Sequence, residues 1–338
     1  MKKSILTINL KAIKYNYNHL KCHYKKKIIA VLKDDAYGLG IKKIVSTLMD
    51  DKDLVVAVNS FKDLENIKEM KVKKLYLNIF DKDDLLYFKE NKISVVLSSL
   101  NQLEYLKNSN IPFHIKINVG MNRIGLNKEE YLQAINIIST DRESYNLEGI
   151  MCHFPTSDAN HSFYNIFKEL VTLCPFYKNL MIHCFASSSI FEESFTNYIR
   201  VGIKLYGVDN SLFYQNCLYL NAPIIQKKFI KKGEKVGYDL AYAAISDGYL
   251  YLLPIGYGQG WGRFIDSYAF FDNHYLKQIG KISMDYSIYF STIDLNIGEN
   301  IELIGNHISL KSLATINYQD VHEVLIKIKV DKDYLTYL

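Results

Sequence analysis

Residues 26–40 read KKIIAVLKDDAYGLG, an apolar run of strand length that stops at Lys33 and continues through a glycine-containing segment of helix length. The pattern predicts a strand followed by a helix. A desolvated lysine at the end of a strand provides an amine that can form a Schiff base. Because a lysine there can equally extend its ammonium group into solvent, Lys33 is a candidate nucleophile that needs independent support.

The same alternation of apolar runs and amphipathic stretches continues to about residue 208. Eight βα units close into a barrel more readily than into an open sheet at this length. The sequence therefore favours an α/β fold with an N-terminal (β/α)8 TIM barrel over an open, doubly wound sheet. The predicted strands are Ile28 to Lys33, Leu54 to Val58, Lys74 to Ile79, Ile93 to Ser98, Phe113 to Asn118, Leu147 to His153, Leu180 to Phe185 and Val201 to Val208.

Two intervening segments carry clear signals for the start of a helix. Ser60 is an N-cap residue for a helix over residues 60–70, and Asn127 precedes two glutamates at the start of a helix over residues 127–139. Such polar residues accept hydrogen bonds from the first backbone N–H groups of a helix. The caps support the alternation of strands and helices.

After Leu212 the sequence changes to short β-rich runs separated by Gly, Asn and Asp turns, which predicts a C-terminal all-β domain. The expected division is residues 11–212 for a cofactor-binding barrel and residues 213–338 for the β-rich domain. Residues 1–10 contain an N-terminal strand that we expect to join the β domain. A helix through His19 and Tyr24 should follow that strand.

Composition indicates an ordinary globular protein, with 49% hydrophobic and 23% charged residues among 338. The formal charge of +5 is spread along the chain, and its densest basic groups, residues 25–27 and 227–232, are short and lack aromatic interleaving. We interpret them as solvated faces and expect no nucleic-acid partner.

The chain has no run of 18 apolar residues, and residues 4–10 are too short and polar for a signal-peptide core, so we expect a cytoplasmic protein without membrane association.

The five cysteines are scattered and include no CxxC pair, which suggests free thiols and no metal site.

In a βα-barrel, reactive groups lie at the carboxyl ends of the strands. The predicted strands place a group of basic and imidazole side chains near those ends. These residues are Lys33, Lys116, Arg123, His153 and His183, and Arg200 opens the eighth predicted strand.

Eight segments in order resemble the motifs of one enzyme family, the pyridoxal-phosphate-dependent alanine racemases of bacteria. The first is AVLKDDAYGLG at residues 30–40, which looks like the family's cofactor-lysine motif. The others are INVGMNRIGL (117–126), MCHF (151–154), HCFASSS (183–189), IRVGIKLYGV (199–208), KVGYDLAY (235–242), LPIGYGQGWGR (253–263) and KISMDY (281–286). The resemblance covers nearly the whole chain and implies the fold-type III architecture.

By resemblance, Lys33 holds the cofactor covalently and acts as one catalytic base, and Tyr238 is the second. Racemisation needs one base on each face of the substrate, because a single base tends to return the proton to the face it left. The resemblance also implies an obligate homodimer with shared active sites, in which Tyr238 serves the partner's Lys33. D-alanine for peptidoglycan synthesis would be the product.

The remaining site residues are implied in the same way. The cofactor phosphate would be held by Tyr37, Ser187, Gly202 and Ile203, and the pyridine ring by His153 and Arg200. Arg123 and the backbone N–H of Met284 would bind the substrate carboxylate, since an arginine fork suits its two oxygens. Tyr257 would line a narrow substrate channel. Lys116 matches a lysine that many relatives carry as a carbamate supporting the substrate arginine.

The sequence departs from the family pattern at three places. Phe185 and Ala186 stand where Ala-Asn is usual, Gln259 stands where Asp is usual, and Val330 falls roughly where a tyrosine near the phosphate is expected. These changes concern phosphate affinity and substrate range. They leave open the alternative that the chain is an amino-acid racemase of broader specificity, which acts on serine or another small side chain.

Two functions outside the racemases are alternatives for this sequence. A related barrel decarboxylase would typically use a cysteine from its second domain, whereas this chain has the tyrosine of VGYD and the arginine of IRVGI. A non-enzymatic pyridoxal-phosphate-binding protein would need no second domain of this size. The sequence favours alanine racemase over both.

Overall fold

The computed structural model describes residues 3–156, 162–186, 195–208, 213–264 and 266–336. The chain divides into two compact units. One consists of Tyr17–Ala36 and Gly40–Leu205, and the other of Met1–Asn16, Tyr37–Leu39 and Tyr206–Leu338. The division passes through the first helix, α1 (Leu10–Tyr24), which was expected from the sequence.

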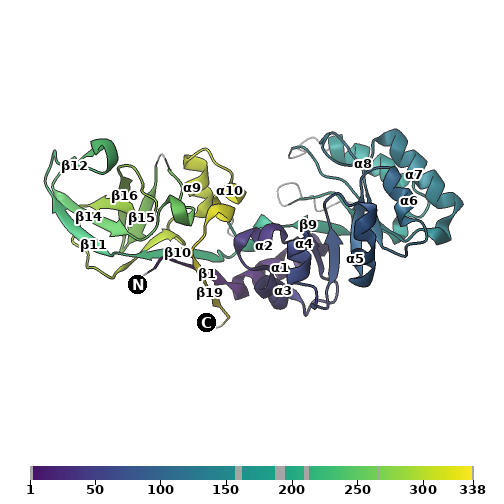
Figure 1. The fold of residues 1–338 in the computed structure, drawn as a ribbon, viewed down its shortest axis with the longest axis horizontal. Helices are drawn as coiled ribbons and strands as arrows, with labels where there is room; N and C mark the ends of the chain where they lie inside the picture. The colour runs from purple at the N-terminus through teal and green to yellow at the C-terminus, as the bar shows by residue number, and fades with distance from the viewer. Residues whose placement is uncertain (1–2, 157–161, 187–194, 209–212, 265, 337–338) are drawn as a thin grey trace. The chain divides into compact units, whose positions relative to one another are not determined.

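The first unit is an eight-stranded parallel barrel (Figure 1), as predicted. Its strands follow one another in the order β8-β7-β6-β5-β4-β3-β2-β9. Backbone hydrogen bonds from Asn197 N to Ile182 O and from Arg200 N to Phe185 O, both 3.2 Å, connect the two ends of the sheet. The strands are β2 (Lys27–Val31), β3 (Val55–Val58), β4 (Lys73–Tyr76), β5 (Ile93–Leu97), β6 (Phe113–Lys116), β7 (Leu147–Met151), β8 (Met181–His183) and β9 (Tyr198–Val201).

Helices alternate with these strands, and both predicted caps are confirmed. The Ser60 side chain accepts a hydrogen bond from Asp63 N, and Asn127 forms a capping box with Glu130. The helix after Ser60 ends at Asn66, earlier than predicted. The helices of this unit after Lys33 are α3 (Ile41–Leu48), α4 (Phe61–Asn66), α5 (Leu85–Glu90), α6 (Asn101–Leu106), α7 (Lys128–Thr140) and α8 (Ser162–Thr172).

The last barrel strand differs from its prediction. It was expected over residues 201–208 with Arg200 at its start, but β9 covers Tyr198–Val201 and Arg200 is its third residue. Residues Ile203–Tyr206 instead form a 3-10 helix, in which Leu205 N donates to Gly202 O at 3.0 Å. The strand therefore ends at Val201, and the residues after Gly202 curl rather than extend.

Inside the barrel, apolar side chains from several strands form a dry cluster. All of its members are at most 7% exposed: Ile29, Val55, Ala57, Leu75, Val96, Met151 and Met181. Branched side chains suit this position because they pack closely against neighbouring strands. The cluster therefore packs the interior of the barrel.

The second unit contains a nine-stranded sheet in the order β11-β14-β17-β16-β15-β18-β10-β1-β19. The opening strand β1 (Ile5–Asn9) pairs with β10 and β19. The predicted β-rich architecture is confirmed, with two short helices in addition, α9 (Leu310–Ile316) and α10 (Val321–Lys327). The other strands are β10 (Leu218–Pro223), β11 (Gln226–Ile230), β14 (Gly248–Leu253), β15 (Tyr268–Phe271), β16 (His274–Ile279), β17 (Ser287–Ser291), β18 (Asn300–Ile304) and β19 (Asp331–Leu335).

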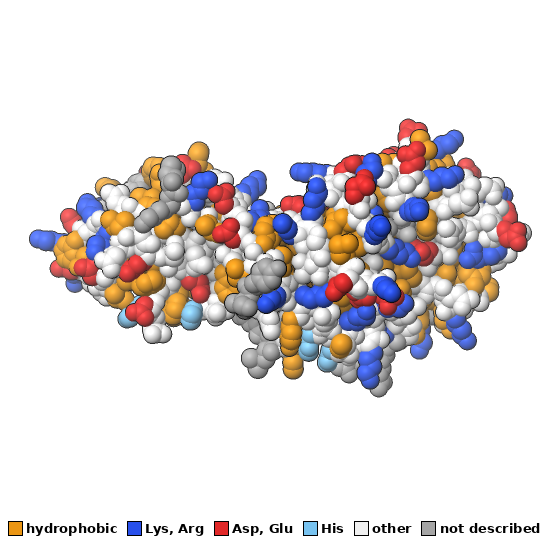
Figure 2. Space-filling model, turned by 90° about the horizontal axis from the view of Figure 1, so that it is seen from below, with side chains coloured by type: hydrophobic (Ala, Val, Ile, Leu, Met, Phe, Trp, Pro, Cys, Tyr) orange, Lys and Arg blue, Asp and Glu red, His pale blue; other side chains and the backbone are white. Residues whose placement is uncertain are grey.

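Basic and acidic side chains are intermingled on the face shown in Figure 2. Charged side chains at the protein surface also form ion pairs, such as Lys27 with Asp53 at 2.9 Å and Lys107 with Asp141 at 3.0 Å. Exposed pairs of this kind contribute little to stability. No helix among the described residues is both long and apolar enough to cross a membrane.

A close backbone contact in the β-rich unit requires a glycine. Gly260 has φ of 79°, and a Cβ atom built there would lie 1.5 Å from Lys327 O. The neighbouring Gln259 O accepts a hydrogen bond from Lys329 N at 2.8 Å. The loop that contains Gly260 is thereby joined to the segment after α10.

We expect Gly260→Ala to destabilise the protein more than Gly233→Ala. Gly233 has a similar φ of 87° but nothing within 4 Å of an added Cβ, so it measures backbone strain alone, about 1–2 kcal/mol. The clash at Gly260 should add about 1–3 kcal/mol. Urea unfolding of both variants tests this, and equal losses would contradict the contact.

Candidate active site

Lys33 lies just beyond the carboxyl end of β2 and begins α2 (Lys33–Gly38). Its side chain is half-buried. The next four residues, Asp34 to Tyr37, have φ of 55°, 55°, 56° and 62°. This short helix is therefore left-handed, which costs roughly 1–2 kcal/mol per residue for side chains with a Cβ.

Asp63 holds the left-handed turn. Its carboxylate accepts hydrogen bonds from the backbone N–H groups of Asp34 at 2.9 Å and Asp35 at 2.8 Å. Asp63 is 2% exposed, and the Ser60 hydroxyl donates to the same carboxylate at 2.8 Å. A buried, charged acceptor that binds two adjacent N–H groups offsets part of the backbone strain. The start of α4 thereby fixes the backbone that carries Lys33.

Hydrogen bonds to the residues just before and after the turn also hold its backbone. Ala36 N donates to Leu32 O at 3.1 Å, and Gly40 N donates to Asp35 O at 2.9 Å. The Asp35 side chain accepts from Ile41 N at 2.9 Å, at the start of α3. Backbone strain of this kind is typical of functional sites, where surrounding contacts over-determine it.

Lys116 ends β6 and is 7% exposed. Burial lowers the pKa of its amine to about 8, and the positive charges of Arg123 and Arg200 act in the same direction. Arg123 lies in the exposed loop after β6, which the Asn118 side chain organises by accepting from Gly120 N and Asn122 N. Lys116 and Arg123 are therefore close enough for their positive charges to interact.

Arg200 is almost completely buried at 5% exposure, and its hydrogen bonds fix its orientation. Nη1 donates to His183 Nδ1 at 2.8 Å and His183 O at 2.9 Å. Nη2 donates to Cys152 O at 2.7 Å and Cys184 O at 3.1 Å. Of the five N–H donors of a guanidinium, only Nε–H lacks an acceptor among the described residues.

His153 follows β7 and lies beside Arg200, with 3.5 Å between Nδ1 and Nη2. The pKa of His153 is lowered to about 4. Burial is the main cause, and four nearby positive charges act in the same direction. They belong to Arg200, Arg123, Lys116 and Lys33. His153 is therefore neutral at physiological pH, at the centre of a cationic cluster formed by the ends of four barrel strands.

These residues fit the expected cofactor. Pyridoxal phosphate carries an aldehyde, an anionic phosphate and a pyridine nitrogen. The Lys33 amine suits the aldehyde, the remaining Nε–H of Arg200 suits the ring nitrogen, and the cationic cluster suits the negative charges. Gly202 and Ile203 lie directly after β9, where barrels often bind phosphate.

The other two predicted phosphate contacts, Tyr37 and Ser187, remain predictions. Tyr37 belongs to the second unit and packs against the rings of Tyr206 and His322, with centroid distances of 5.9 Å and 5.7 Å. Ser187 lies outside the described residues. Phe185, one of the departures from the family pattern, is fully buried and stacks on Tyr164 at 5.6 Å.

Tyr238 lies in the second unit, at the tip of the hairpin formed by β12 (Lys235–Val236) and β13 (Tyr242–Ala243). It is 63% exposed. The preceding Gly237 has φ of 78°, and the following Asp239 forms an ion pair with Lys281. The turn thus presents the phenol outwards from a fixed backbone.

Tyr257 and Met284, predicted to contact the substrate, are neighbours in the second unit. Tyr257 N donates to Ser283 O at 3.1 Å, and Gly258 N donates to Met284 O at 2.8 Å. Among the described residues, no acceptor is recorded for the N–H of Met284. Gln259 accepts from Gly256 N at 2.9 Å within the first loop and donates to Asp285 Oδ1 at 3.3 Å in the second. The structure therefore joins these two predicted residues in one exposed region.

Sequence reasoning missed several supporting residues. Asp63 is the most important, and the spacing of Ser60 and Asp63, which is typical of a helix start, was its only signal. His114 and Glu148 received no role because they lie early in their strands. Lys33, Lys116, Arg123, His153 and Arg200 were predicted, and the structure brings all five into the first unit.

Comparisons with known proteins agree with this arrangement. The family model for the alanine racemase N-terminal domain matches residues 8–210, and that for the C-terminal domain matches residues 217–333. The alanine racemase of Rickettsia canadensis is 30% identical, with 95% of each chain covered. That of Staphylococcus epidermidis is 29% identical, covering 93% of this chain and 90% of the other.

Solved structures agree as well. The crystal structure of alanine racemase from Bartonella henselae, with covalently bound pyridoxal phosphate, superposes with a TM-score of 0.91 at 27% identity. The match covers 99% of this chain and 100% of that chain. The similarity therefore extends through both units.

We expect Asp63→Asn to loosen the turn after Lys33. An amide replaces one acceptor oxygen with an NH2 group, so either Asp34 N–H or Asp35 N–H loses its partner, at a cost of about 1–3 kcal/mol. Hydrogen exchange at these two amides and urea unfolding measure the effect. Asp53→Asn, at a 45% exposed side chain, is the control and should cost less than about 0.5 kcal/mol. Unchanged protection of both amides in Asp63→Asn would refute the clamp.

Proposed function

The chain belongs to the alanine racemase family, and we propose that it interconverts L-alanine and D-alanine with pyridoxal phosphate held covalently by Lys33 and with Tyr238 as the opposing base. One observation carries this proposal. Four cationic side chains surround the neutral His153 at the carboxyl ends of the barrel strands, and one of them is Lys33 on its strained turn.

Arg200 adapts the site to racemisation. When bound, pyridoxal phosphate withdraws electrons from the substrate α-carbon as its proton is removed. A guanidinium does not give up its proton in proteins, so Arg200 donates a hydrogen bond to the ring nitrogen without protonating it. His153, whose pKa of about 4 keeps it neutral, packs beside the ring without adding positive charge. Both residues moderate the electron withdrawal and limit side reactions.

Lys33 and Tyr238 take opposite faces of the substrate. Each removes or returns the α-proton on its own side, which allows the configuration to invert. In a head-to-tail homodimer with two shared sites, Tyr238 acts on the substrate bound at the partner's Lys33. The exposed hairpin supports this arrangement, because Leu240 in its turn and Ile245 just after β13 are 58% and 73% exposed and offer apolar surface for a second copy.

Arg123 and the N–H of Met284 bind the substrate carboxylate, and Tyr257 narrows the channel that leads to it. Lys116 supports Arg123 as a carbamate. A carbamate forms from a neutral amine, and a pKa of about 8 leaves an appreciable neutral fraction of Lys116 at physiological pH. The modified side chain is an anion, and it would attract the guanidinium that the unmodified lysine repels.

The phosphate is held by Tyr37, Ser187 and the backbone N–H groups of Gly202 and Ile203. Residues 11–212 form the cofactor-binding domain and residues 213–338 the β-rich domain, with residues 1–10 supplying a strand to the latter. The pairing of β1 with β10 supports that division. The protein acts in the cytoplasm and supplies D-alanine for peptidoglycan.

We expect the cofactor-loaded protein to convert L-alanine to D-alanine and to show an absorption band near ~420 nm from the lysine–cofactor linkage. Lys33→Ala should abolish both the band and the conversion, because the amine is lost. Lys42→Ala changes an exposed lysine on α3 and should leave both intact. Chiral chromatography and absorption spectroscopy measure the two effects.

L-Serine in a parallel reaction distinguishes the alternatives. Conversion at a rate comparable to that of L-alanine would replace the proposal with a broad-specificity racemase. A bound cofactor without any D-product would point instead to a non-enzymatic cofactor-binding protein. A band that persists in Lys33→Ala would remove Lys33 from its role.

A further inference from the structure

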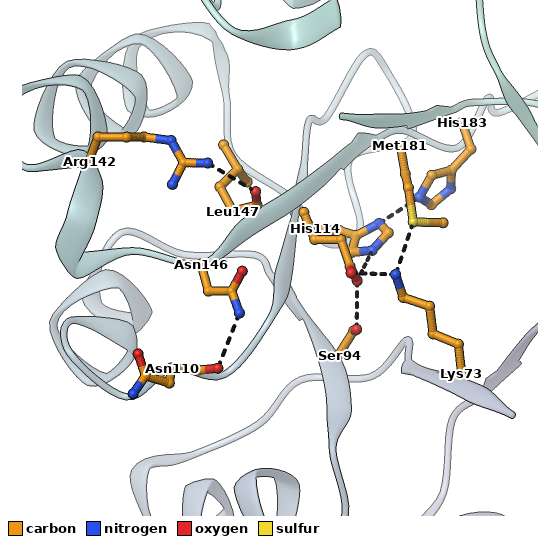
Figure 3. Close-up of polar contacts among 10 residues, drawn as sticks. Lys73, Ser94, Asn110, His114, Arg142, Asn146, Leu147, Met181 and His183 are labelled. Carbon is orange, nitrogen blue, oxygen red and sulfur yellow. Dashed lines mark hydrogen bonds and ion pairs between the residues drawn. The ribbon is translucent and has the colours of Figure 1, made fainter. Parts of the chain in front are cut away.

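A line of hydrogen-bonded side chains crosses the interior of the barrel from Arg200 to Glu148. His183 Nδ1 lies 2.8 Å from Arg200 Nη1, and His183 Nε2 lies 2.8 Å from His114 Nδ1. His114 Nε2 lies 3.2 Å from Glu148 Oε2. Figure 3 shows His114 and His183 pointing toward each other, with Ser94 and Lys73 at the far end of the line.

Glu148 is the fixed end of this line. The Ser94 hydroxyl donates to its Oε2 at 2.7 Å, and Lys73 pairs with its Oε1. Burial raises the pKa of this carboxyl, but the hydrogen bonds from His114, Lys73 and Ser94 outweigh that effect and hold the pKa at about 2. Glu148 is therefore an anion, which can accept hydrogen bonds but cannot donate them.

Both histidines are neutral. His114 and His183 are fully buried, and burial lowers the pKa of each ring, with the positive charge of Arg200 acting in the same direction. A neutral imidazole has one N–H donor and one acceptor nitrogen. Each ring in the line can therefore take only one of two tautomers.

The two ends of the line select the same tautomers. Glu148 accepts, so His114 must donate from Nε2 and accept at Nδ1. His183 must then donate from Nε2 and accept at Nδ1, where the Arg200 Nη1–H arrives. The opposite choice would place two N–H groups against each other at Arg200 and two acceptors against each other at Glu148. Arg200, which can only donate, and Glu148, which can only accept, therefore select the same donor direction for the line.

The backbone is adapted to this line at Gly149. A Cβ atom there would lie 2.5 Å from His114 Nδ1, so the ring of His114 packs directly on the chain of β7. The residue next to the carboxylate therefore has no side chain, and the imidazole takes its space. Any other residue at 149 would displace the ring from both of its partners.

We propose that Glu148 is a positioning residue for the reaction: by accepting from His114 it completes the line of hydrogen bonds that holds Nη1 of Arg200, which leaves Nε–H for the pyridine nitrogen. The inference rests on the proposed function for the role of that nitrogen. Glu148 itself lies at the second residue of β7 and acts only through the histidines and Arg200.

The test compares Glu148→Leu, Glu148→Gln and the control Ile150→Val, a fully buried position on the same strand. Leucine removes the acceptor. Glutamine keeps one oxygen for His114 and Ser94, and its NH2 group faces Lys73, whose side chain is 39% exposed and can move into solvent. The readouts are the 15N spectrum of histidine-labelled protein, with and without cofactor, and the dissociation constant for pyridoxal phosphate.

We expect Glu148→Leu to leave His114 Nε2–H without its acceptor, which shifts the 15N signals of His114, and to weaken cofactor binding by about tenfold, the order expected for one lost hydrogen bond. Glu148→Gln and Ile150→Val should keep the wild-type tautomers and bind within about threefold of wild type. An unchanged His114 spectrum or an unchanged cofactor affinity in Glu148→Leu would overturn the proposal, as would a tautomer change in Glu148→Gln or an equal loss of affinity in Ile150→Val.

The spectra of the cofactor-free protein separate this inference from the proposed function. Wild-type protein that makes no D-alanine but shows the predicted tautomers would refute the function and leave the line of hydrogen bonds intact. Wild-type His183 protonated at Nδ1 would refute the inference even if racemisation is fast.

Discussion

The paired hydrogen bonds from Asp34 N and Asp35 N to the Asp63 carboxylate are the interaction on which the site depends. Without them, four consecutive non-glycine residues would relax from the left-handed region. Lys33 is the first residue of that turn, so its direction follows from the turn's geometry. Asp63 lies in the first turn of α4, where a carboxylate would ordinarily bind the N–H groups of its own helix. Here it binds the N–H groups of the turn after Lys33 and so orients the lysine of a neighbouring βα unit.

The second constraint is electrostatic. Four positive side chains share a small region, and only neutral or anionic groups can stabilise them together. The neutral His153, the carbonyl groups of Cys152 and Cys184 and the neutral His183 surround Arg200 within the protein. The remaining positive charge suits a phosphate and a carboxylate, the two anionic groups that a cofactor and an amino acid would bring.

Much of this could be predicted from the sequence, because strand-length apolar runs and helix caps are local signals. The barrel, the β-rich unit and the basic residues at strand ends followed from them. The left-handed turn could not be predicted, since Asp, Ala and Tyr do not favour positive φ and a distant carboxylate imposes it. The line through His114 and Glu148 was equally hidden, because residues early in a barrel strand usually serve packing. The end of β9 was misplaced because a 3-10 turn of IKLY has the composition of a strand.

Two bases on opposite faces, Lys33 and Tyr238, are the centre of the proposed chemistry, and one measurement tests them directly. L-Alanine and D-alanine are incubated separately in D2O with wild type, Tyr238→Phe and the control Tyr242→Phe, and deuterium at the α-carbon is followed by mass spectrometry. Wild type and Tyr242→Phe should exchange both enantiomers, whereas Tyr238→Phe should lose exchange for one enantiomer only. Equal losses for both enantiomers, or none, would contradict the assignment of Tyr238 as the second base.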